Sequence, residues 1–246
     1  MTYCVAIMID AGIVFASDSR TNAGVDNVST FRKMRTFENR GERALVFVNS
    51  GNLAVTQATL NQLDQAIRRN VEPNLMSVSS MYDVAELVGE ALREVRHRDG
   101  PYLQENNVDS GANFIVGGQI AGEHQRLFMV YAEGNFIEAT TETPYFQIGE
   151  TKYGKPIIDR VVSGGTCMDD TVKCMLVSFD STMRSNLSVG FPIDLACYDR
   201  ESLRIGRTHR FDEADPYMLR LSQSWGEAYG ALLASYPTWN GIEFSS

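Results

Sequence analysis

Two apolar runs near the start of the chain predict a pair of short strands. Tyr3–Ile9 is apolar almost throughout, and Ile13–Ser17 has the same character after Asp10, Ala11 and Gly12, three residues typical of a turn. Because neither run alternates with polar residues, both faces of the sheet that they form should be covered. We therefore predict an N-terminal hairpin in the interior of the protein.

Further strands are predicted before residue 52. The alternation of apolar and polar residues in Phe31–Phe37 favours a short strand, and the apolar residues of Arg43–Val48 favour another. Residues 19–30 are polar and include Gly24, so they predict a loop that precedes these two strands. Residues Asn49–Asn52 predict a compact turn after them.

Helical periodicity begins after this turn. Apolar residues in Leu53–Arg69 recur at the spacing of one helical face. A second helix should begin after Ser80, whose hydroxyl can cap it, with Asp83 three residues later as a short capping box. Gly100, Pro101 and their polar neighbours through Asp109 predict the longest loop of the chain.

The second half contains further strands and helices. The predicted strands are Ala112–Gln119, Arg126–Tyr131, Phe136–Thr140, Tyr145–Gly149, Pro192–Tyr198 and Ser202–Arg207. The predicted helices are Lys155–Val162, one capped by Thr166, and one from Pro216 to about Ser235. Pairs of helices thus separate blocks of strands, which favours an α+β architecture with antiparallel sheets between helical layers. Because the sequence shows no internal repeat and no linker, we predict a single domain over residues 1–246.

Composition and charge restrict the classes of partner. The 246 residues are 43% hydrophobic, and the net charge is −9, an acidic balance that argues against nucleic-acid binding and against docking on anionic membranes. The chain contains no apolar run of about 18 residues and no basic segment followed by an apolar core near its start. We therefore expect a soluble cytoplasmic protein.

Cysteines and histidines give no indication of a metal or cofactor. The four cysteines, at positions 4, 167, 174 and 197, lack the paired spacing of a zinc site, and only three histidines occur. Reduced structural thiols are the favoured interpretation, and we expect no metal and no cofactor.

Thr2 is the first candidate for catalysis. If Met1 is removed, Thr2 carries a hydroxyl and a free α-amine, which together make a nucleophile with its own base. Many proteins begin with Met-Thr, so the dipeptide alone is weak evidence. The strand that follows directly is unusual, because chain termini commonly fray. A retained Met1 would block the amine, so this hypothesis depends on its removal.

Two charged residues could complete such a site. The predicted hairpin brings residues near 4 opposite residues near 18, so Asp18 should approach Thr2, although a carboxylate at a strand end is more often a turn residue or a surface ion-pair partner. Lys33 would ordinarily be a solvated cation. Because Lys33 lies between the apolar residues Phe31 and Met34, a buried carboxylate nearby could instead draw its side chain into the protein.

Four segments carry a resemblance to a known family. They are Thr2–Ile7 (Thr-Tyr-Cys-Val-Ala-Ile), Phe15–Gly24 (Phe-Ala-Ser-Asp-Ser-Arg-Thr-Asn-Ala-Gly), Phe31–Met34 (Phe-Arg-Lys-Met) and Ser50–Asn52 (Ser-Gly-Asn). In this order the chain resembles the proteasome β-subunit family of N-terminal nucleophile hydrolases, and within it the bacterial branch called Anbu, the ancestral beta subunit.

The resemblance implies a fold, an activity and residue roles. The fold would be a four-layer αββα sandwich of two antiparallel sheets between helical layers. The activity would be that of a threonine-type peptidase or amidohydrolase acting on a peptide or amide, assembled with copies of itself in a ring or helix. Thr2 matches the nucleophile, Asp18 and Lys33 match the pair beside it, and Gly51 matches the glycine whose N–H helps to form the oxyanion hole.

The supporting residues depart from the family pattern. Ser188 resembles the serine of a Ser-Gly-Gly segment, and Arg20 belongs to the implied supporting set. Ser185 stands where the family has an aspartate, Val189 replaces the first glycine of the segment, and Gly149–Thr151 (Gly-Glu-Thr) replace a Gly-Ser-Gly. A polar site is thus kept with different groups, which leaves the substrate preference open.

Two alternative functions remain open at this stage. An amine rather than water could resolve the acyl-enzyme, which would make the protein a peptide ligase or transpeptidase. Alternatively, the site could be vestigial in a ring-forming scaffold. An apolar last helix with Trp225, and an aromatic tail with Trp239 and Phe244, are explained about as well by assembly as by packing within the chain.

Overall fold

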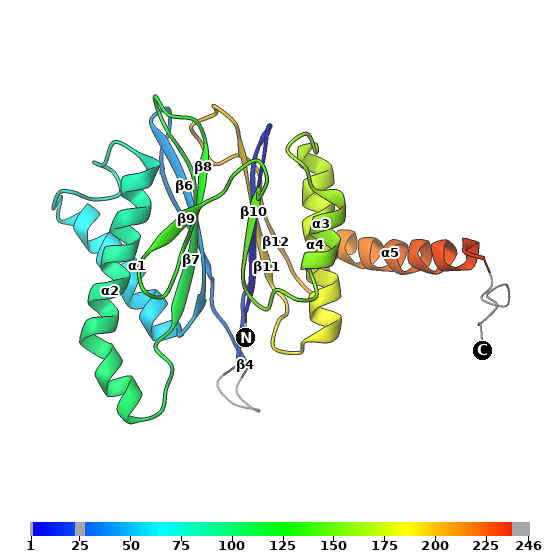
Figure 1. The fold of residues 1–246 in the computed structure, drawn as a ribbon, viewed down its shortest axis with the longest axis horizontal. Helices are drawn as coiled ribbons and strands as arrows, with labels where there is room; N and C mark the ends of the chain where they lie inside the picture. The colour runs from blue at the N-terminus through cyan, green and yellow to red at the C-terminus, as the bar shows by residue number, and fades with distance from the viewer. Residues whose placement is uncertain (1, 23–27, 238–246) are drawn as a thin grey trace, which may run out of the picture.

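Two antiparallel sheets form the centre of the protein (Figure 1). The computed structural model describes residues 2–22 and 28–237. Its strands are β1 (Tyr3–Ile9), β2 (Gly12–Asp18), β3 (Arg20–Asn22), β4 (Val28–Thr30), β5 (Met34–Asn39), β6 (Arg43–Gly51), β7 (Ala112–Ile120), β8 (Arg126–Val130), β9 (Phe136–Glu138), β10 (Tyr145–Gly149), β11 (Ile193–Asp199) and β12 (Thr208–Phe211). Its helices are α1 (Leu53–Arg68), α2 (Met81–Glu105), α3 (Lys155–Val161), α4 (Met168–Ser185) and α5 (Pro216–Ser235). The predicted α+β class with antiparallel sheets is confirmed.

The first sheet contains the N-terminal hairpin. Its strand order is β10-β1-β2-β11-β12, so β1 and β2 are interior strands. Within the hairpin Cys4 pairs with Ser17, and all but one residue of the two strands are buried. The hairpin that the two apolar runs predict is therefore present, with both faces covered.

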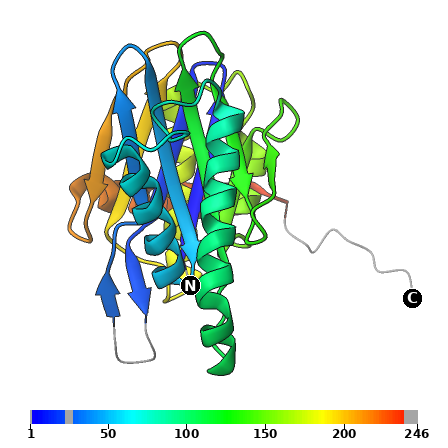
Figure 2. The same cartoon turned by 90° about the vertical axis from the view of Figure 1, so that its left-hand side faces the viewer.

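The second sheet has the order β5-β6-β7-β8-β9. A separate two-stranded ribbon, β3–β4, pairs Arg20 with Thr30. In both views this ribbon and the last turns of α2 extend beyond the sheets, at the end of the molecule where the chain begins (Figures 1 and 2). The elements that surround Thr2 are therefore at one end of the molecule.

Three apolar clusters hold the layers together. Helices α1 and α2 cover the outer face of the second sheet, where Phe47 and Leu92 are fully buried. Helices α3 and α4 cover the outer face of the first sheet, where Ile7 packs with Phe179. Phe15 lies in the third cluster, between the two sheets. The alternation of side chains along each strand thus supplies both an inner and an outer core.

Helix α5 differs from the other helices, because it projects away from the layers (Figure 1). Only Met218 in its first turn is buried. No helix of the described residues is long and apolar enough to span a membrane.

Two predicted loops are partly regular structure. Helix α2 continues through Gly100 and Pro101 to Glu105, so the predicted loop over these residues is wrong. A proline removes one hydrogen bond from a helix, but Leu103 beyond it still packs against the core under α1 and α2. Residues 19–30 contain β3 and β4, while Gly24 lies outside the described residues.

Other predicted boundaries are also wrong. Residues Asn49–Gly51 continue β6 instead of turning, because they pair with β7 as far as Ala112. The edge strand β5 begins at Met34, three residues later than predicted.

Two features between α3 and the C-terminus differ from prediction. The hydroxyl of Thr166 accepts a hydrogen bond from the N–H of Ser163 (2.9 Å), and Cys167 is the N-cap residue of α4. Residues Ser202–Arg207 are not a strand, because Leu203 has a positive φ of 46° directly after a turn that the Ser202 N–H closes onto the Asp199 carbonyl oxygen. The last strand is β12 instead.

Candidate active site

Thr2 is buried at the start of β1, with 9% of its surface exposed. Its carbonyl oxygen accepts a hydrogen bond from the N–H of Glu150 (2.7 Å). Gly149, which pairs with Tyr3, has a φ of +87°, and a Cβ at this position would lie 1.9 Å from the Thr2 carbonyl oxygen. Glycine at the end of β10 therefore allows the close approach that holds Thr2 in place.

Asp18 lies next to Thr2 because of the hairpin register. Its Oδ1 atom accepts a hydrogen bond from the N–H of Tyr3 (3.1 Å), the residue directly after Thr2. The same oxygen lies 2.7 Å from the Nζ atom of Lys33. Asp18 therefore links the Thr2–Tyr3 peptide to the lysine, as the hairpin predicts.

Lys33 is drawn into the protein and is only 4% exposed. Besides the Asp18 carboxylate, its ammonium also binds the carbonyl oxygen of Arg20 (2.6 Å). The carbonyl oxygen of Lys33 in turn accepts from the side-chain amide (2.8 Å) and the backbone N–H (3.1 Å) of Asn49. Hydrogen bonds at both ends of the residue thus fix the position of its charge.

Burial and charge act on Asp18 in opposite directions. Burial raises the pKa of the Asp18 carboxyl, since the charged form loses its hydration. The Lys33 ammonium and the backbone N–H groups of Tyr3 and Gly190 lower this pKa, but burial outweighs them. The carboxylate therefore depends on Lys33 for its charged state.

A pocket of about 380 Å³ opens beside these residues. Thr2, Lys33 and Gly51 all line it, so the structure brings together the candidate nucleophile, the lysine and the candidate oxyanion-hole glycine. Thr21 lines the same pocket, and its buried hydroxyl has no hydrogen-bond partner among the described residues. The sequence did not indicate that Thr21 belongs to this pocket.

Gly51 occupies a position that no larger residue fits. It ends β6 with a φ of +107°, and a Cβ there would lie 2.2 Å from the carbonyl oxygen of Gly111. Asn52, the next residue, caps α1 by accepting a hydrogen bond from the N–H of Val55 (3.2 Å). The change from strand to helix thus places the backbone of Gly51 at the wall of the pocket.

Ser188 and Arg20 are outside this pocket lining. The Ser188 N–H donates to the side-chain oxygen of Asn186 (2.9 Å) in the turn after α4. The Arg20 guanidinium donates to the carbonyl oxygen of Leu187 (3.0 Å) and packs on Gly190, where a Cβ would lie 2.2 Å from Cζ. Arg20 therefore holds the turn that contains Ser188, and the pocket lining includes neither residue.

Glu150 is a site residue whose role the sequence did not reveal. Its side chain is buried and accepts hydrogen bonds from the side-chain amide of Asn186 (3.0 Å) and from the N–H of Lys152 (3.3 Å). Because its backbone N–H binds Thr2, Glu150 connects the start of β1 to the turn after α4. The departure of Gly149–Thr151 from the family pattern was the available signal, but the partner Asn186 could not be inferred from it.

The arrangement suits acyl transfer by a hydroxyl. A threonine, a fixed ammonium and the backbone of Gly51 meet at one pocket, and these are parts that nucleophilic attack on a carbonyl uses. Among residues 2–22 and 28–237, no three His, Cys, Asp or Glu side chains are grouped so that they could hold a metal ion.

Solved structures similar to this one come from several bacteria. Anbu (ancestral beta-subunit) from Yersinia bercovieri is 48% identical, with a TM-score of 0.92 over 99% of this chain and 100% of that one. An Anbu (Gly-1) mutant from Hyphomicrobium sp. strain MC1 is 44% identical, with a TM-score of 0.90 over the whole of both chains. The Anbu complex of Pseudomonas aeruginosa, described as a helical assembly, is 48% identical, with a TM-score of 0.91 over 96% of this chain and 97% of that one. No protein-family model and no curated protein matches the chain.

Proposed function

Because this chain belongs to the Anbu (ancestral beta-subunit) family of proteasome-like proteins, we propose that it is a threonine-type peptidase or amidohydrolase. Thr2 is the nucleophile once Met1 has been removed. One observation carries this proposal: a single Asp18 oxygen binds both the Lys33 ammonium and the N–H of Tyr3, the residue after Thr2. Thr2 and Lys33 both line the pocket described above.

The reaction needs no group beyond this chain and water. The Thr2 hydroxyl oxygen attacks the carbonyl carbon of the substrate, and its proton passes to the α-amine of Thr2. The C–N bond then breaks, and the protonated amine returns the proton to the leaving nitrogen. Water attacks the resulting ester through the same base, which releases the acid and restores Thr2.

Charge and backbone groups assist these steps. The α-amine has an ordinary pKa of about 7.7–8.0, and the nearby Lys33 ammonium favours its neutral form. The Gly51 N–H stabilises the negative oxygen of the tetrahedral intermediate, a contact typically worth roughly 2.7–4 kcal/mol. Arg20 acts through its carbonyl oxygen on Lys33 and through its guanidinium on the turn that contains Ser188.

The remaining expectations complete the proposal. The helices and sheets form the four-layer αββα sandwich of N-terminal nucleophile hydrolases, as one peptidase domain over residues 1–246 in the cytoplasm. Self-association is part of this proposal, since a related Anbu complex forms a helical assembly.

An apolar stripe on α5 supports self-association. Met218 and Leu221 begin the stripe against the core of this chain, and it continues at helical spacing through Trp225, Tyr229 and Leu232. Tyr229 and Leu232 are 50% and 52% exposed. The stripe thus runs beyond the core of its own chain, and a second copy is the occupant that we propose for it.

This assembly is tested by measuring its mass. The double substitution Tyr229→Glu and Leu232→Glu should reduce the molar mass in size-exclusion chromatography with light scattering, since charge opposes burial of the stripe. Ser224→Glu, on the same helix outside the stripe, is the control and should leave the mass unchanged. A double variant with the mass of the unaltered protein would show that α5 is not the interface.

The activity is tested at the N-terminus itself. Intact mass of protein from its native cell should lack Met1. A peptide vinyl sulfone should then add once to Thr2, and Thr2→Ala should abolish this adduct while Thr2→Ser retains it. Retention of Met1 in the cell, or an adduct that survives Thr2→Ala, would refute the assignment, and retained Met1 would favour a scaffold with a vestigial site.

A further inference from the structure

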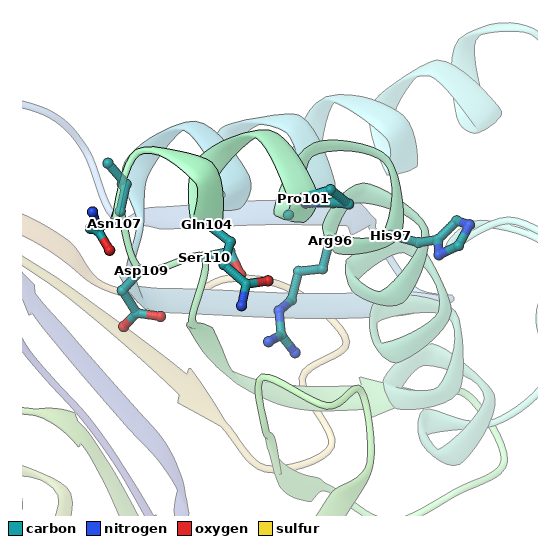
Figure 3. Close-up of a pocket in the computed structure, with 9 residues that line it drawn as sticks. Arg96, His97, Pro101, Gln104, Asn107, Asp109 and Ser110 are labelled. Atoms are coloured by element: carbon teal, nitrogen blue, oxygen red, sulfur yellow. The ribbon is translucent and has the colours of Figure 1, made fainter.

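Asp109 is a charged residue in the wall of the Thr2 pocket. It lies on the loop between α2 and β7, with its carboxylate turned away from the helix (Figure 3). No cationic side chain of the described residues lies within 4 Å of this carboxylate, whereas the other charge in the lining, Lys33, is paired with Asp18. The pocket therefore carries one negative charge that the protein does not neutralise by an ion pair.

The position of this carboxylate is fixed by its loop. Asn52 donates its side-chain amide to the Asp109 carbonyl oxygen (2.9 Å) and its backbone N–H to the Gly111 carbonyl oxygen (2.8 Å). The Asp109 Oδ1 atom accepts a hydrogen bond from the Gly111 N–H (2.8 Å). Because Asn52 follows Gly51 directly, the same contacts fix the carboxylate relative to the candidate oxyanion hole.

The rest of the pocket presents both polar groups and carbon atoms. Asn49, Ser50, Thr56 and Asn113 line it with amides and hydroxyls, and Leu53 is the one large aliphatic side chain of the lining. Its volume is within the range of about 300–1,000 Å³ that is usual for ligand sites. These walls offer acceptors to the donors of a cationic side chain, and carbon surface to the methylene stem that carries them.

Two basic residues of α2 line a different hollow. Arg96 and His97 line a neighbouring space of about 690 Å³, and Asp109 and Ser110 also belong to its lining. Figure 3 shows these residues on α2 and on the loop that follows it. The loop with Asp109 therefore borders both spaces, and the two basic side chains are absent from the lining on the Thr2 side.

We propose that Asp109 makes the site selective for lysine or arginine in the residue whose carbonyl carbon Thr2 attacks. This inference rests on the proposed function of Thr2. The carboxylate would form a charge-assisted hydrogen bond with the ammonium or guanidinium of the substrate, and this bond orients the carbonyl toward Thr2.

Three peptide vinyl sulfones that differ in a single residue test the inference. Such probes contain only the residues on the acyl side of the cleaved bond, so their rates report selectivity on that side alone. They carry arginine, glutamate or norleucine, a neutral apolar residue of similar length, in the position next to the reactive group. The rate of Thr2 adduct formation is measured by intact mass on the Met1-free, assembled protein. Arginine should react roughly tenfold or more faster than norleucine, and glutamate slowest.

The matched variants are Asp109→Asn and Glu105→Gln. Asparagine keeps the oxygen that binds the Gly111 N–H but removes the charge, so the arginine-to-norleucine rate ratio should fall toward one. Glu105 ends α2 and is absent from the pocket lining, so Glu105→Gln should keep the ratio. Raising the ionic strength should lower the ratio of the unaltered protein, a readout that does not depend on folding of any variant.

The outcomes separate the two proposals. Equal rates for arginine and norleucine on Thr2, or an unchanged ratio in a folded Asp109→Asn, would overturn the role of Asp109 and leave Thr2 as the nucleophile. Failure of every probe to label Thr2 in Met1-free protein would instead overturn the proposed function, and this inference with it.

Discussion

The Lys33 ammonium lies 2.7 Å from the Asp18 carboxylate, and the two side chains are 5% and 0% exposed. This pair joins the end of β2 to the segment that leads into β5 in the other sheet. Each charge of a buried pair needs the other, because either one alone would lose its hydration without compensation. The pair is therefore a structural link as well as part of the proposed site.

Removing one member of this pair should destabilise the fold strongly. For Lys33→Met we expect the free energy of unfolding to fall by about 3–5 kcal/mol, since the buried Asp18 carboxyl loses the ammonium that compensates its charge. Urea unfolding followed by circular dichroism measures this loss. The double variant Asp18→Leu and Lys33→Met should recover most of it, and a double variant less stable than Lys33→Met would contradict the account.

Much of this site could be predicted from local sequence. Two unbroken apolar runs and an intervening Asp-Ala-Gly turn specify the hairpin, and its register places Asp18 beside Tyr3. The inward position of Lys33 followed from its apolar neighbours only as one of two interpretations. In the structure the Lys33 ammonium points inward, where it binds the Asp18 carboxylate and the Arg20 carbonyl oxygen.

Contacts between distant segments could not be predicted. Glu150 and Asn186 are 36 residues apart, and no local pattern links them. Helix α2 also continues through Pro101, although proline disfavours the interior of a helix. The packing of Leu103 against the core outweighs this local preference. The strand predicted over Ser202–Arg207 is absent, since Leu203 has a positive φ, and β12 begins only at Thr208.

Gly149 should be the most sensitive glycine of the site. In Gly149→Ala the new Cβ would overlap the Thr2 carbonyl oxygen at 1.9 Å, so the Glu150 hydrogen bond to Thr2 should be lost and labelling of Thr2 should slow by at least about tenfold. The rate of vinyl sulfone addition measures this effect.

Gly41→Ala is the matched control for that substitution. Gly41 has a similar φ of +81° but no atom within 4 Å of an added Cβ. It should therefore show only the backbone strain, about 1–2 kcal/mol, and unchanged labelling. Equal labelling of the two variants would show that Thr2 does not depend on Gly149.

The Tyr3 hydroxyl should contribute to stability through a buried hydrogen-bond chain. Gln147 donates to it (2.6 Å), it lies 3.0 Å from the Ser178 hydroxyl, and Ser178 donates to the Met175 carbonyl oxygen (2.6 Å). Tyr3→Phe leaves the Gln147 amide without its acceptor, so the free energy of unfolding should fall by about 1–3 kcal/mol. Tyr102→Phe, at a 70% exposed tyrosine, should change it little in the same urea titration. A Tyr3→Phe variant as stable as Tyr102→Phe would refute this role.

The cap of α5 should make stability depend on pH. Asp215 accepts hydrogen bonds from the N–H groups of Tyr217 (2.8 Å) and Met218 (3.2 Å), and its carboxylate lies 3.1 Å from the His209 ring. Burial raises the pKa of Asp215, but the hydrogen bonds from His209 and the two N–H groups outweigh it, so this pKa is lowered in the folded protein. A carboxyl with a lowered pKa stabilises the fold fully above its ordinary pKa of about 3.9, and this contribution is lost as the pH falls through the lower, folded value.

Asp215→Asn separates the charge from the cap, because asparagine also caps helices but does not titrate. The unaltered protein should be more stable than Asp215→Asn at pH 7, and this difference should shrink as the pH falls below about 4. Asp215→Ala should cost about 0.5–2 kcal/mol at pH 7, since it removes the cap as well. Urea unfolding at a series of pH values measures all three proteins. A difference from Asp215→Asn that stays constant with pH would mean that the Asp215 charge does not stabilise α5.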